Sequence, residues 1–176
     1  RTTDQDARID TERPADKAEH DHRADDRDEH APDVEPGNTD GADEVAPALD
    51  LIKCGGATLC EKIVAQASAR VILIADDSKL SPALGTKFVL PVEVLEFGWR
   101  SQARFLESRG AAVTPRTGNG GLYCTDQGNI ILDSQFGPIA DTAGLLEARA
   151  GLAGHGFFIG IASDVIVAGK AGIRRL

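Results

Sequence analysis

Two short segments of this chain combine acidic, basic and glycine residues in patterns that suit acid–base or anion-binding chemistry. Asp40–Glu44 places three carboxylates around an Asp-Gly turn, although such turns are common without any site. Lys53–Gly56 places a lysine before two glycines and an expected helix. Glycines there let backbone N–H groups face an anion, with the lysine as countercharge. A plain strand-to-helix turn has the same spacing, so this pattern alone leaves both interpretations open.

Two further groups are carboxylates at the ends of expected elements. Glu61 lies in the first turns of a helix, opposite its apolar stripe, where it could be a base or simply suit the helix dipole. Asp76–Lys79 follows directly after the apolar run Val71–Ala75. Ligands in open α/β sheets bind beyond the carboxyl ends of strands, so this position favours a site.

The elements around these groups follow a β-α-β order. Leu49–Lys53 is a short apolar run, and Ala57–Arg70 has apolar residues at helical spacing without an internal Gly or Pro. Val71–Ala75 is apolar without alternation, which predicts a parallel strand covered on both faces. Asp164–Gly169 reads as another buried strand that could return to the same sheet. This pattern predicts an α/β fold.

A second region begins near Pro91 and has the order β-α-β-β-α-β, which predicts a small ferredoxin-like α+β lobe. A glycine-rich turn at residues 118–121 leads into its middle part. We expect strands at Val92–Phe97, Ala111–Pro115, Leu122–Thr125, Ile130–Ser134 and Phe157–Ile161, and helices at Arg100–Arg109 and from Asp141 to Arg149.

The charge of the chain is concentrated at its amino-terminal end. The net charge is -9, and residues 1–45 hold 16 acidic against 6 basic side chains. Ile9 and Val34 are the only large apolar residues in 1–38, so this segment cannot bury enough surface to offset its ordering entropy, and we expect it to be disordered. His20, His22 and His30 could chelate a metal weakly there, but a solvated tail is the favoured interpretation.

Composition excludes several classes of protein. The remainder of the chain, residues 46–176, is nearly neutral and has no Lys/Arg stripe for nucleic acid. Its apolar runs are of strand length, far below the ~20 residues that a membrane helix needs. The three cysteines, Cys54, Cys60 and Cys124, form no CxxC pair, and an odd, sparse count predicts reduced thiols in the cytoplasm.

Several blocks occur in an order and spacing that closely resemble the A-type ribose-5-phosphate isomerases. They cover about residues 40–176 and read GADEV, LIKCGG, CEKI, VILIADDSKL, LPVEVLEFGW, CTDQGNIILD and SDVIVAG. The resemblance implies an aldose–ketose isomerase that interconverts ribose 5-phosphate and ribulose 5-phosphate as a homodimer, with no metal or organic cofactor. Such a reaction needs a base, donors for an enediolate oxygen and a phosphate clamp.

The resemblance also implies roles for particular residues. Glu61 occupies the position of the family's proton acceptor, and Lys79 that of a substrate-binding lysine with Asp76 beside it. The remaining implied substrate contacts come from two loops and are Asp40, Gly41, Ala42, Asp43, Lys53, Cys54, Gly55 and Gly56.

The chain departs from the family pattern in ways that bear on activity. Cys54 replaces a glycine, Cys60 replaces an arginine, and the interval from Lys53 to Glu61 is one residue short. A one-residue deletion before a helix rotates a side chain by ~100° unless the turn absorbs it. Neither the family's glycine-rich phosphate loop nor an apolar strand before Asp40 is found in residues 1–39, where Pro36 and acidic residues are poor strand formers.

We therefore expect an incomplete Rossmann-like parallel sheet from residues 39–90 and 162–176, a ferredoxin-like lobe from 91–161, and a non-homologous segment 1–38. Truncation could leave the chain inactive. Two alternatives to the enzyme remain open, which are a non-catalytic sugar-phosphate sensor and a fragment that only dimerises. The sensor would bind ligand without turnover, whereas the fragment would self-associate without binding ligand.

Overall fold

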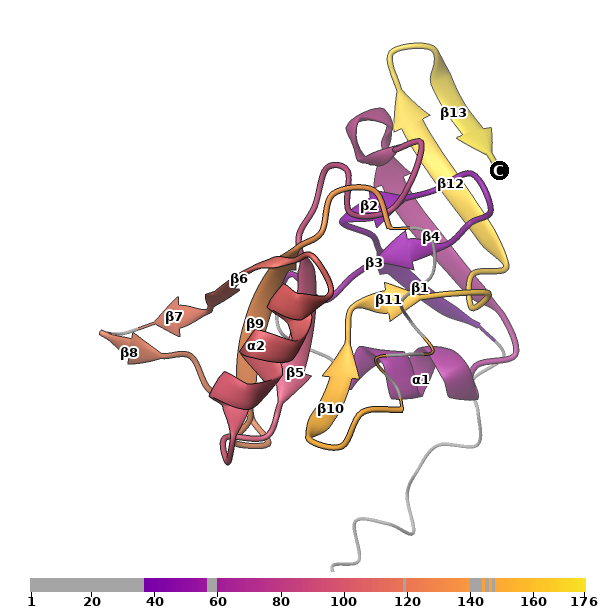
Figure 1. Cartoon of the computed structure of the whole chain (residues 1–176). Helices are drawn as coiled ribbons and strands as arrows, with labels where there is room; N and C mark the ends of the chain where they lie inside the picture. Colours follow the sequence, from indigo (N-terminus) through magenta and orange to yellow (C-terminus); the bar gives the residue numbers. More distant parts are fainter. Residues whose placement is uncertain (1–36, 57–59, 119, 140–143, 145, 147) are drawn as a thin grey trace, which may run out of the picture. The chain divides into compact units, whose positions relative to one another are not determined.

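The computed structural model describes residues 37–56, 60–118, 120–139, 144, 146 and 148–176 (Figure 1). Nearly all of the expected acidic tail, including its three histidines, lies outside these ranges, as does most of the helix expected from Asp141. The described residues fall within one compact unit, residues 33–176. No helix in this described part is long and apolar enough to cross a membrane.

A mixed, mainly parallel sheet carries the acidic loops. It has the order β1-β4-β12-β13, in which β1 (Asn38–Gly41) and β12 (Asp164–Gly169) run parallel to the central β4 (Val71–Asp76). The last strand, β13 (Gly172–Arg175), turns back antiparallel to β12. This confirms the α/β fold with a parallel sheet and the return of residues 164–169 to β4.

Two expectations for this sheet are wrong. The polar residues 38–41, which include Asp40 itself, form a strand where none was expected, because their backbone makes a parallel ladder with β4 that outweighs the poor strand propensity of their side chains. In addition, β4 is not covered on both faces by the residues that the structure describes. Val71, Leu73 and Ala75 are buried, whereas Ile74 between them is 51% exposed.

The second sheet is antiparallel and forms the ferredoxin-like lobe. Its order is β10-β5-β9-β6, and α2 (Trp99–Ser108) packs on it through the buried Leu106. The strands are β5 (Leu90–Val94), β6 (Ala112–Pro115), β9 (Ile130–Gln135) and β10 (Leu152–His155). A short hairpin of β7 (Thr117–Gly118) and β8 (Gly121–Leu122) projects from it, in place of the strand expected at Leu122–Thr125.

The sequence predicted that Phe157–Ile161 is the last strand of the lobe. In the structure this place is taken by β10. Phe157–Phe158 instead forms β11, which pairs with β3 (Leu51–Ile52) in a third sheet completed by β2 (Glu44–Val45). Gly156 makes the change of sheet possible. Its N–H donates to Pro91 O and its carbonyl accepts from Lys53 N, and an added Cβ would lie 2.4 Å from Lys53 O.

The helix between the two parallel strands is shorter than expected. α1 spans Glu61–Ala67, and it ends because Ser68 takes an extended conformation with ψ 138°. Residues 57–59, where the sequence predicted its first turn, lie outside the described residues. Glu61 is therefore the first residue of the helix, close to the end of β3.

A buried carboxylate next to the acidic loop organises the segment that leads to the lobe. Glu44 is fully buried and accepts hydrogen bonds from the backbone N–H groups of Gly85, Lys87 and Phe88, at 2.8, 2.9 and 3.2 Å. These bonds satisfy backbone donors of the loop at residues 85–88, which is not paired with any strand that the structure describes. Glu44 thus has a structural role within the Asp40–Glu44 group.

We predict that Glu44→Gln lowers the free energy of unfolding by about 2–3 kcal/mol, because the amide replaces a charged acceptor and sets its own N–H₂ against backbone donors. Urea unfolding measures this loss. Glu107→Gln, on the exposed face of α2, is the matched control and should stay within about 0.5 kcal/mol of the parent chain. Equal stabilities of the two variants would contradict this role.

A second charged cluster links β13 to the amino-terminal ends of the neighbouring strands β4 and β12. The buried Asp164, at the start of β12, accepts hydrogen bonds from Arg70 at 2.7 and 3.0 Å and pairs with Arg175 of β13. The hydrogen bonds from Arg70 and then those from Arg175 hold the pKa of Asp164 below its ordinary value, against an opposing effect of desolvation.

This pKa predicts the pH dependence of stability. A lowered folded-state pKa means that the carboxylate stabilises the fold above the ordinary Asp pKa of about 4, and this contribution is lost as the pH falls through the folded-state value. The stability difference between the parent chain and Asp164→Asn should be constant near neutrality and shrink below about pH 4. Unfolding midpoints from pH 7 to 3 test this, with the exposed Asp126→Asn as control. A difference that does not change with pH would exclude it.

Candidate functional site

A buried lysine lies at the centre of the predicted site residues. Lys53 is only 4% exposed, and its Nζ donates to Gly41 O at 2.6 Å and pairs with Asp40 Oδ2 at 2.7 Å. The Glu61 Oε2 atom lies 3.6 Å from the same ammonium. We call Asp40, Lys53 and Glu61 the Lys53 cluster. The structure thus brings together three side chains that are 13 and 8 residues apart in sequence.

Three different elements supply the cluster. Asp40 lies near the carboxyl end of β1, Lys53 directly follows β3, and Glu61 opens α1. The backbone of Lys53 is fixed by its N–H, which donates to Gly156 O at 2.9 Å. The cluster therefore lies at the carboxyl end of β1, a strand of the parallel sheet, whereas the sequence argument from strand ends concerned Asp76–Lys79.

Glu61 lies next to Lys53 although the interval between them is one residue shorter than in the family pattern. Cys54 has φ of 71°, a left-handed conformation that a non-glycine residue adopts at a cost. With this turn, Glu61 faces Lys53 and is not rotated away from it. The replacement of glycine by Cys54 is compatible with the turn, but Cys54 remains the strained residue within it.

The glycine turn, residues Lys53–Gly56, is held against the acidic loop. The N–H of Gly55 donates to Asp43 Oδ2 at 2.9 Å, while Asp43 N donates to Ile52 O at 2.9 Å. A Cβ on Gly55 would lie 3.0 Å from Asp43 Oδ2 and from Phe88 Cζ, so only glycine fits there without a shift. Asp43 and Gly55 were both predicted as site residues, and here they position each other.

Burial and the cluster's carboxylate suppress the ionisation of Cys54. Desolvation, followed by the negative charge of Glu61, raises the pKa of the Cys54 thiol from 9.0 to about 12, although Lys53 acts in the opposite direction. A thiol with such a pKa is a poor nucleophile at neutral pH. Cys54 therefore acts through its backbone conformation and packing.

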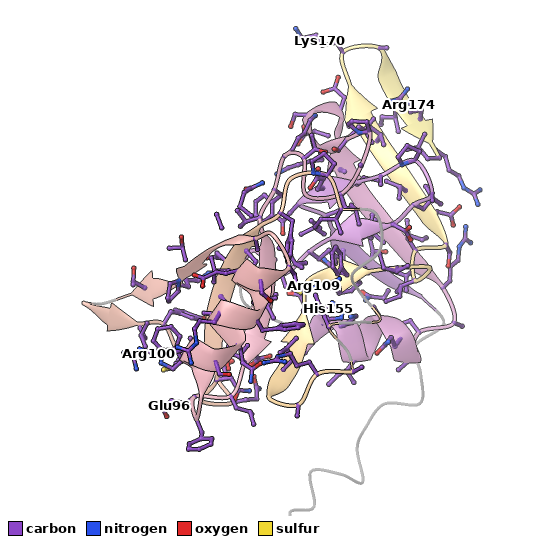
Figure 2. All side chains as sticks on the ribbon, viewed as in Figure 1. Glu96, Arg100, Arg109, His155, Lys170 and Arg174 are labelled. Carbon is purple, nitrogen blue, oxygen red and sulfur yellow. The ribbon has the colours of Figure 1, made fainter. Side chains whose placement is uncertain are left out.

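Phe158 of β11 forms an apolar wall beside the cluster. Its ring is fully buried, with Lys53 Nζ 5.5 Å and Lys62 Nζ 5.9 Å from its centroid. Lys62 also lies 3.4 Å from Nδ1 of His155, which is buried near α1 (Figure 2). Sequence reasoning gave Phe158 only a strand position, and no spacing signal linked Phe158 or His155 to Lys53.

Lys79 and Asp76 lie at the same edge of the sheet but outside the Lys53 cluster. Both are at the carboxyl end of β4, where Asp77–Lys79 forms a short 3-10 helix. The Ser78 hydrogen bonds, including one from Ser78 N to Asp76 Oδ1 at 2.8 Å, and then the charge of Lys79 lower the pKa of Asp76. Asp76 therefore caps this helix, and Lys79 is free of a direct ion pair with the Lys53 cluster among the described residues.

Arg116 is a site-adjacent residue that sequence reasoning missed. It lies between β6 and β7 of the lobe, and its guanidinium donates to Gly55 O at 2.7 Å. The same guanidinium forms a two-pronged pair with Asp133 of β9. Because 61 residues separate Arg116 from Gly55, no local pattern could have connected them.

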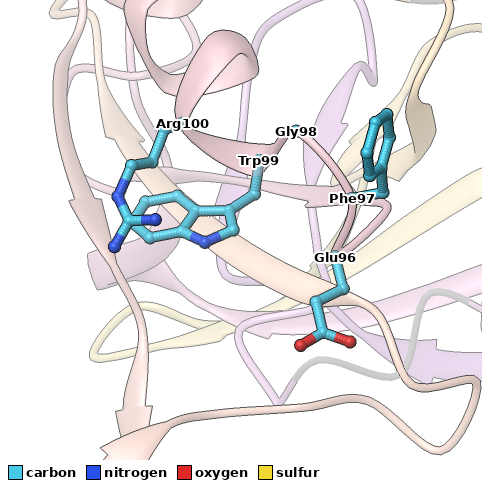
Figure 3. A pocket seen from close by; sticks show the side chains of 5 residues that line it. All are labelled: Glu96, Phe97, Gly98, Trp99 and Arg100. Atoms are coloured by element: carbon cyan, nitrogen blue, oxygen red, sulfur yellow. The ribbon is translucent and has the colours of Figure 1, made fainter.

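A separate hollow of about 480 Å³ lies at the tip of the lobe, lined by residues 96–100. Figure 3 shows the Arg100 guanidinium against the Trp99 ring, with their centres 4.6 Å apart, while Phe97 points away from them. Its lining contains no carboxylate paired with a buried cation, in contrast to the Lys53 cluster. The cluster is thus the stronger candidate for chemistry.

The arrangement of the Lys53 cluster suits proton transfer next to a polarised oxygen. Glu61 is partly exposed and can accept a proton, and Lys53 can donate to an oxygen on which negative charge develops. Within the described ranges, no group of three or more His, Cys, Asp or Glu side chains is placed to hold a metal ion.

Comparison with known proteins identifies the family of the chain. The sequence model of the family described as ribose 5-phosphate isomerase A (phosphoriboisomerase A) matches residues 18–172. The chain belongs to this family. Ribose-5-phosphate isomerase A of Chloroflexus aurantiacus is 58% identical over 142 residues, and that of Desulfatibacillum aliphaticivorans is 53% identical over 142 residues. Each alignment covers 78% of this chain.

Solved structures of ribose-5-phosphate isomerases have the same fold. One, a D-ribose-5-phosphate isomerase in complex with phospho-erythronic acid, is 36% identical, with a TM-score of 0.77. The Plasmodium falciparum enzyme is 32% identical, with a TM-score of 0.75. Each match covers 80% of this chain and 64% of the solved one. The chain spans 59% and 62% of the length of the two curated isomerase A relatives.

The three cysteines allow a test of the site in solution. The exposed Cys60 and Cys124 should react with a thiol reagent in the folded protein, whereas Cys54 should not. A pKa of about 12 in place of 9.0 lowers the thiolate fraction at pH 8 about a thousandfold, and burial slows access further. We expect two fast thiols per folded chain and a third on unfolding. Three fast thiols would contradict the placement of Cys54.

Proposed function

We propose that this chain interconverts ribose 5-phosphate and ribulose 5-phosphate, with Glu61 as the base. The observation that carries the proposal is the Glu61 carboxylate 3.6 Å from the buried Lys53 ammonium, on a chain of the isomerase A family. The reaction moves a proton between C2 and C1 of the open-chain sugar. It therefore needs one group that accepts and returns a proton and another that stabilises an enediolate oxygen.

In this proposal, Glu61 removes the proton from C2 of the aldose and delivers it to C1. Lys53 donates a hydrogen bond to the oxygen that becomes negative, and it is already desolvated, which strengthens that interaction. Asp40 orients the ammonium through its 2.7 Å contact. Glu61 thus carries the proton from C2 to C1, while the hydroxyl proton on O2 passes to O1. C1 is reduced and C2 is oxidised within the same sugar, so the step needs no external oxidant or reductant.

The remaining predicted contacts are proposed to hold the substrate. Asp43 has one carboxylate oxygen bound to Gly55 N–H, which leaves the other for a sugar hydroxyl. The backbone of the glycine turn and of Gly41 and Ala42 surrounds the cluster, and Lys79 provides a second positive charge at the same sheet edge. These substrate contacts are Asp40, Gly41, Ala42, Asp43, Lys53, Cys54, Gly55, Gly56 and Lys79.

We also propose that the active form is a cytoplasmic homodimer, with residues 39–90 and 162–176 as the catalytic domain and 91–161 as the lobe that dimerises. The odd cysteine count supports a reducing compartment. The 96% exposed Phe97 and the 47% exposed Leu95, both on the lobe, support an apolar contact with a second copy.

The test is turnover of ribose 5-phosphate by the parent chain and by Glu61→Gln. The variant keeps the shape of Glu61 but cannot accept the proton, so we expect its kcat to fall roughly 10²–10⁴-fold. Glu107→Gln, an exposed glutamate of α2, is the matched control and should be fully active. Binding of phospho-erythronic acid, measured by thermal shift, should persist in Glu61→Gln.

The outcomes separate the candidate functions. If the parent chain binds the ligand but does not turn over ribose 5-phosphate, the result would favour a sugar-phosphate sensor over an enzyme. Neither binding nor turnover, together with self-association, would leave only the dimerising fragment. Turnover that survives in Glu61→Gln would show that another group is the base.

A further inference from the structure

The glycine turn is held from two sides by charged side chains that belong to different sheets. On one side, Asp43 accepts the Gly55 N–H at 2.9 Å. On the other, Arg116 donates from one terminal nitrogen to the Gly55 carbonyl at 2.7 Å. The Gly55 residue is therefore fixed at both its hydrogen-bonding groups, immediately beside the strained Cys54 and the buried Lys53.

Arg116 itself is held rigidly by the lobe. Its Nε donates to Asp133 Oδ2 at 2.9 Å, and its second terminal nitrogen pairs with Asp133 Oδ1 at 2.5 Å. Its backbone N–H donates to Ile131 O at 2.8 Å, and its carbonyl accepts from Tyr123 N at 2.9 Å. Both side chains of the pair are largely buried, with 18% and 23% exposure.

The planar fork of an arginine is required for this arrangement. Three nitrogens of one guanidinium reach three different oxygens, two on Asp133 and one on Gly55. An ammonium is a point charge and cannot satisfy a bidentate carboxylate and a carbonyl in the same geometry. Asp133 neutralises the charge and fixes the rotamer, so that the third nitrogen points at the turn.

We propose that Arg116 is a positioning residue that fixes the glycine turn, and through it Lys53 and Cys54, from the ferredoxin-like lobe. The lobe then contributes to the site directly, through one side chain. The part of this inference that concerns substrate rests on the proposed function, in which the glycine turn contacts the sugar phosphate. The positioning of the turn itself does not depend on turnover.

Cys54 provides a reporter for the turn. In a Cys60→Ser/Cys124→Ser background, Cys54 is the one remaining thiol, and its buried position makes its labelling rate a measure of local opening. Arg116→Gln removes the charged fork, so at pH 8 we expect labelling to become at least about 10-fold faster, the size of one lost charged hydrogen bond. Arg116→Lys should be intermediate.

Arg109→Gln is the matched control, because Arg109 is exposed at the end of α2 (Figure 2). Labelling is repeated at low urea concentrations. A local opening gives a rate that hardly changes with urea, whereas global unfolding gives a steep rise. Arg116→Gln labelling that is no faster than Arg109→Gln, or that is faster only through global unfolding, would overturn the proposal.

Kinetics give a second readout in the same variants. A displaced turn shifts both the substrate contacts and Lys53, so kcat/KM for ribose 5-phosphate should fall at least about 10-fold, with kcat lowered as well as KM raised. If Arg116→Gln does not fold, Arg116→Lys and Asp133→Asn replace it in both measurements. If the parent chain shows no turnover, the proposed function is wrong. The rate of Cys54 labelling still tests the role of Arg116 in that case.

Discussion

The ammonium of Lys53 is the buried charge around which this structure is organised. Removing an ammonium from water is costly unless it is paired and hydrogen-bonded, and here three oxygen-bearing groups and an aromatic face compensate it. Those partners come from β1, α1 and β11. Satisfying one charge therefore requires three segments to meet at the residue that follows β3. The candidate site and the stability of its surroundings depend on the same contacts.

The junction between the sheets depends on close backbone approach. Gly156 lies where β10 of the lobe gives way to β11 of the small sheet, and it hydrogen-bonds to the backbones of both Lys53 and Pro91. A side chain would overlap the Lys53 carbonyl, so the backbone that carries Lys53 can pair only with a glycine. The position of the buried charge is thus set by packing of main chain on main chain, with little freedom to adjust.

Charged pairs reinforce this junction in a directional way. Glu44 holds the loop at residues 85–88 that leads into the lobe, and Arg116 returns from the lobe to the glycine turn. Each uses an ionised group with several hydrogen bonds, which restricts direction more than apolar packing does. The segment from β1 to α1 supplies the acidic residues, and the antiparallel lobe supplies Arg116, which holds the turn facing them.

The sequence by itself determined the fold class, the family and the residues of the candidate site. Blocks such as VILIADDSKL and CTDQGNIILD carry local patterns and order, and β4, α2, β9 and β12 lie close to the expected ranges. Asp40, Lys53 and Glu61 could be named because their types and positions match a family pattern. That Glu61 faces Lys53 despite a shortened interval could not, since it depends on the path of the whole segment between the two residues.

Tertiary structure decided the features that depend on distant partners. β1 forms from poor strand residues because β4 offers it a ladder, and β10 replaces Phe157–Ile161 in the lobe because Gly156 redirects the chain to β3. Arg116 donates to Gly55 although 61 residues separate them, and Phe158 lies beside two lysines. No periodic pattern in the sequence predicts either contact. Local propensity extends over a few residues, whereas these contacts are selected by the pairing of backbone groups and buried charges across the whole fold.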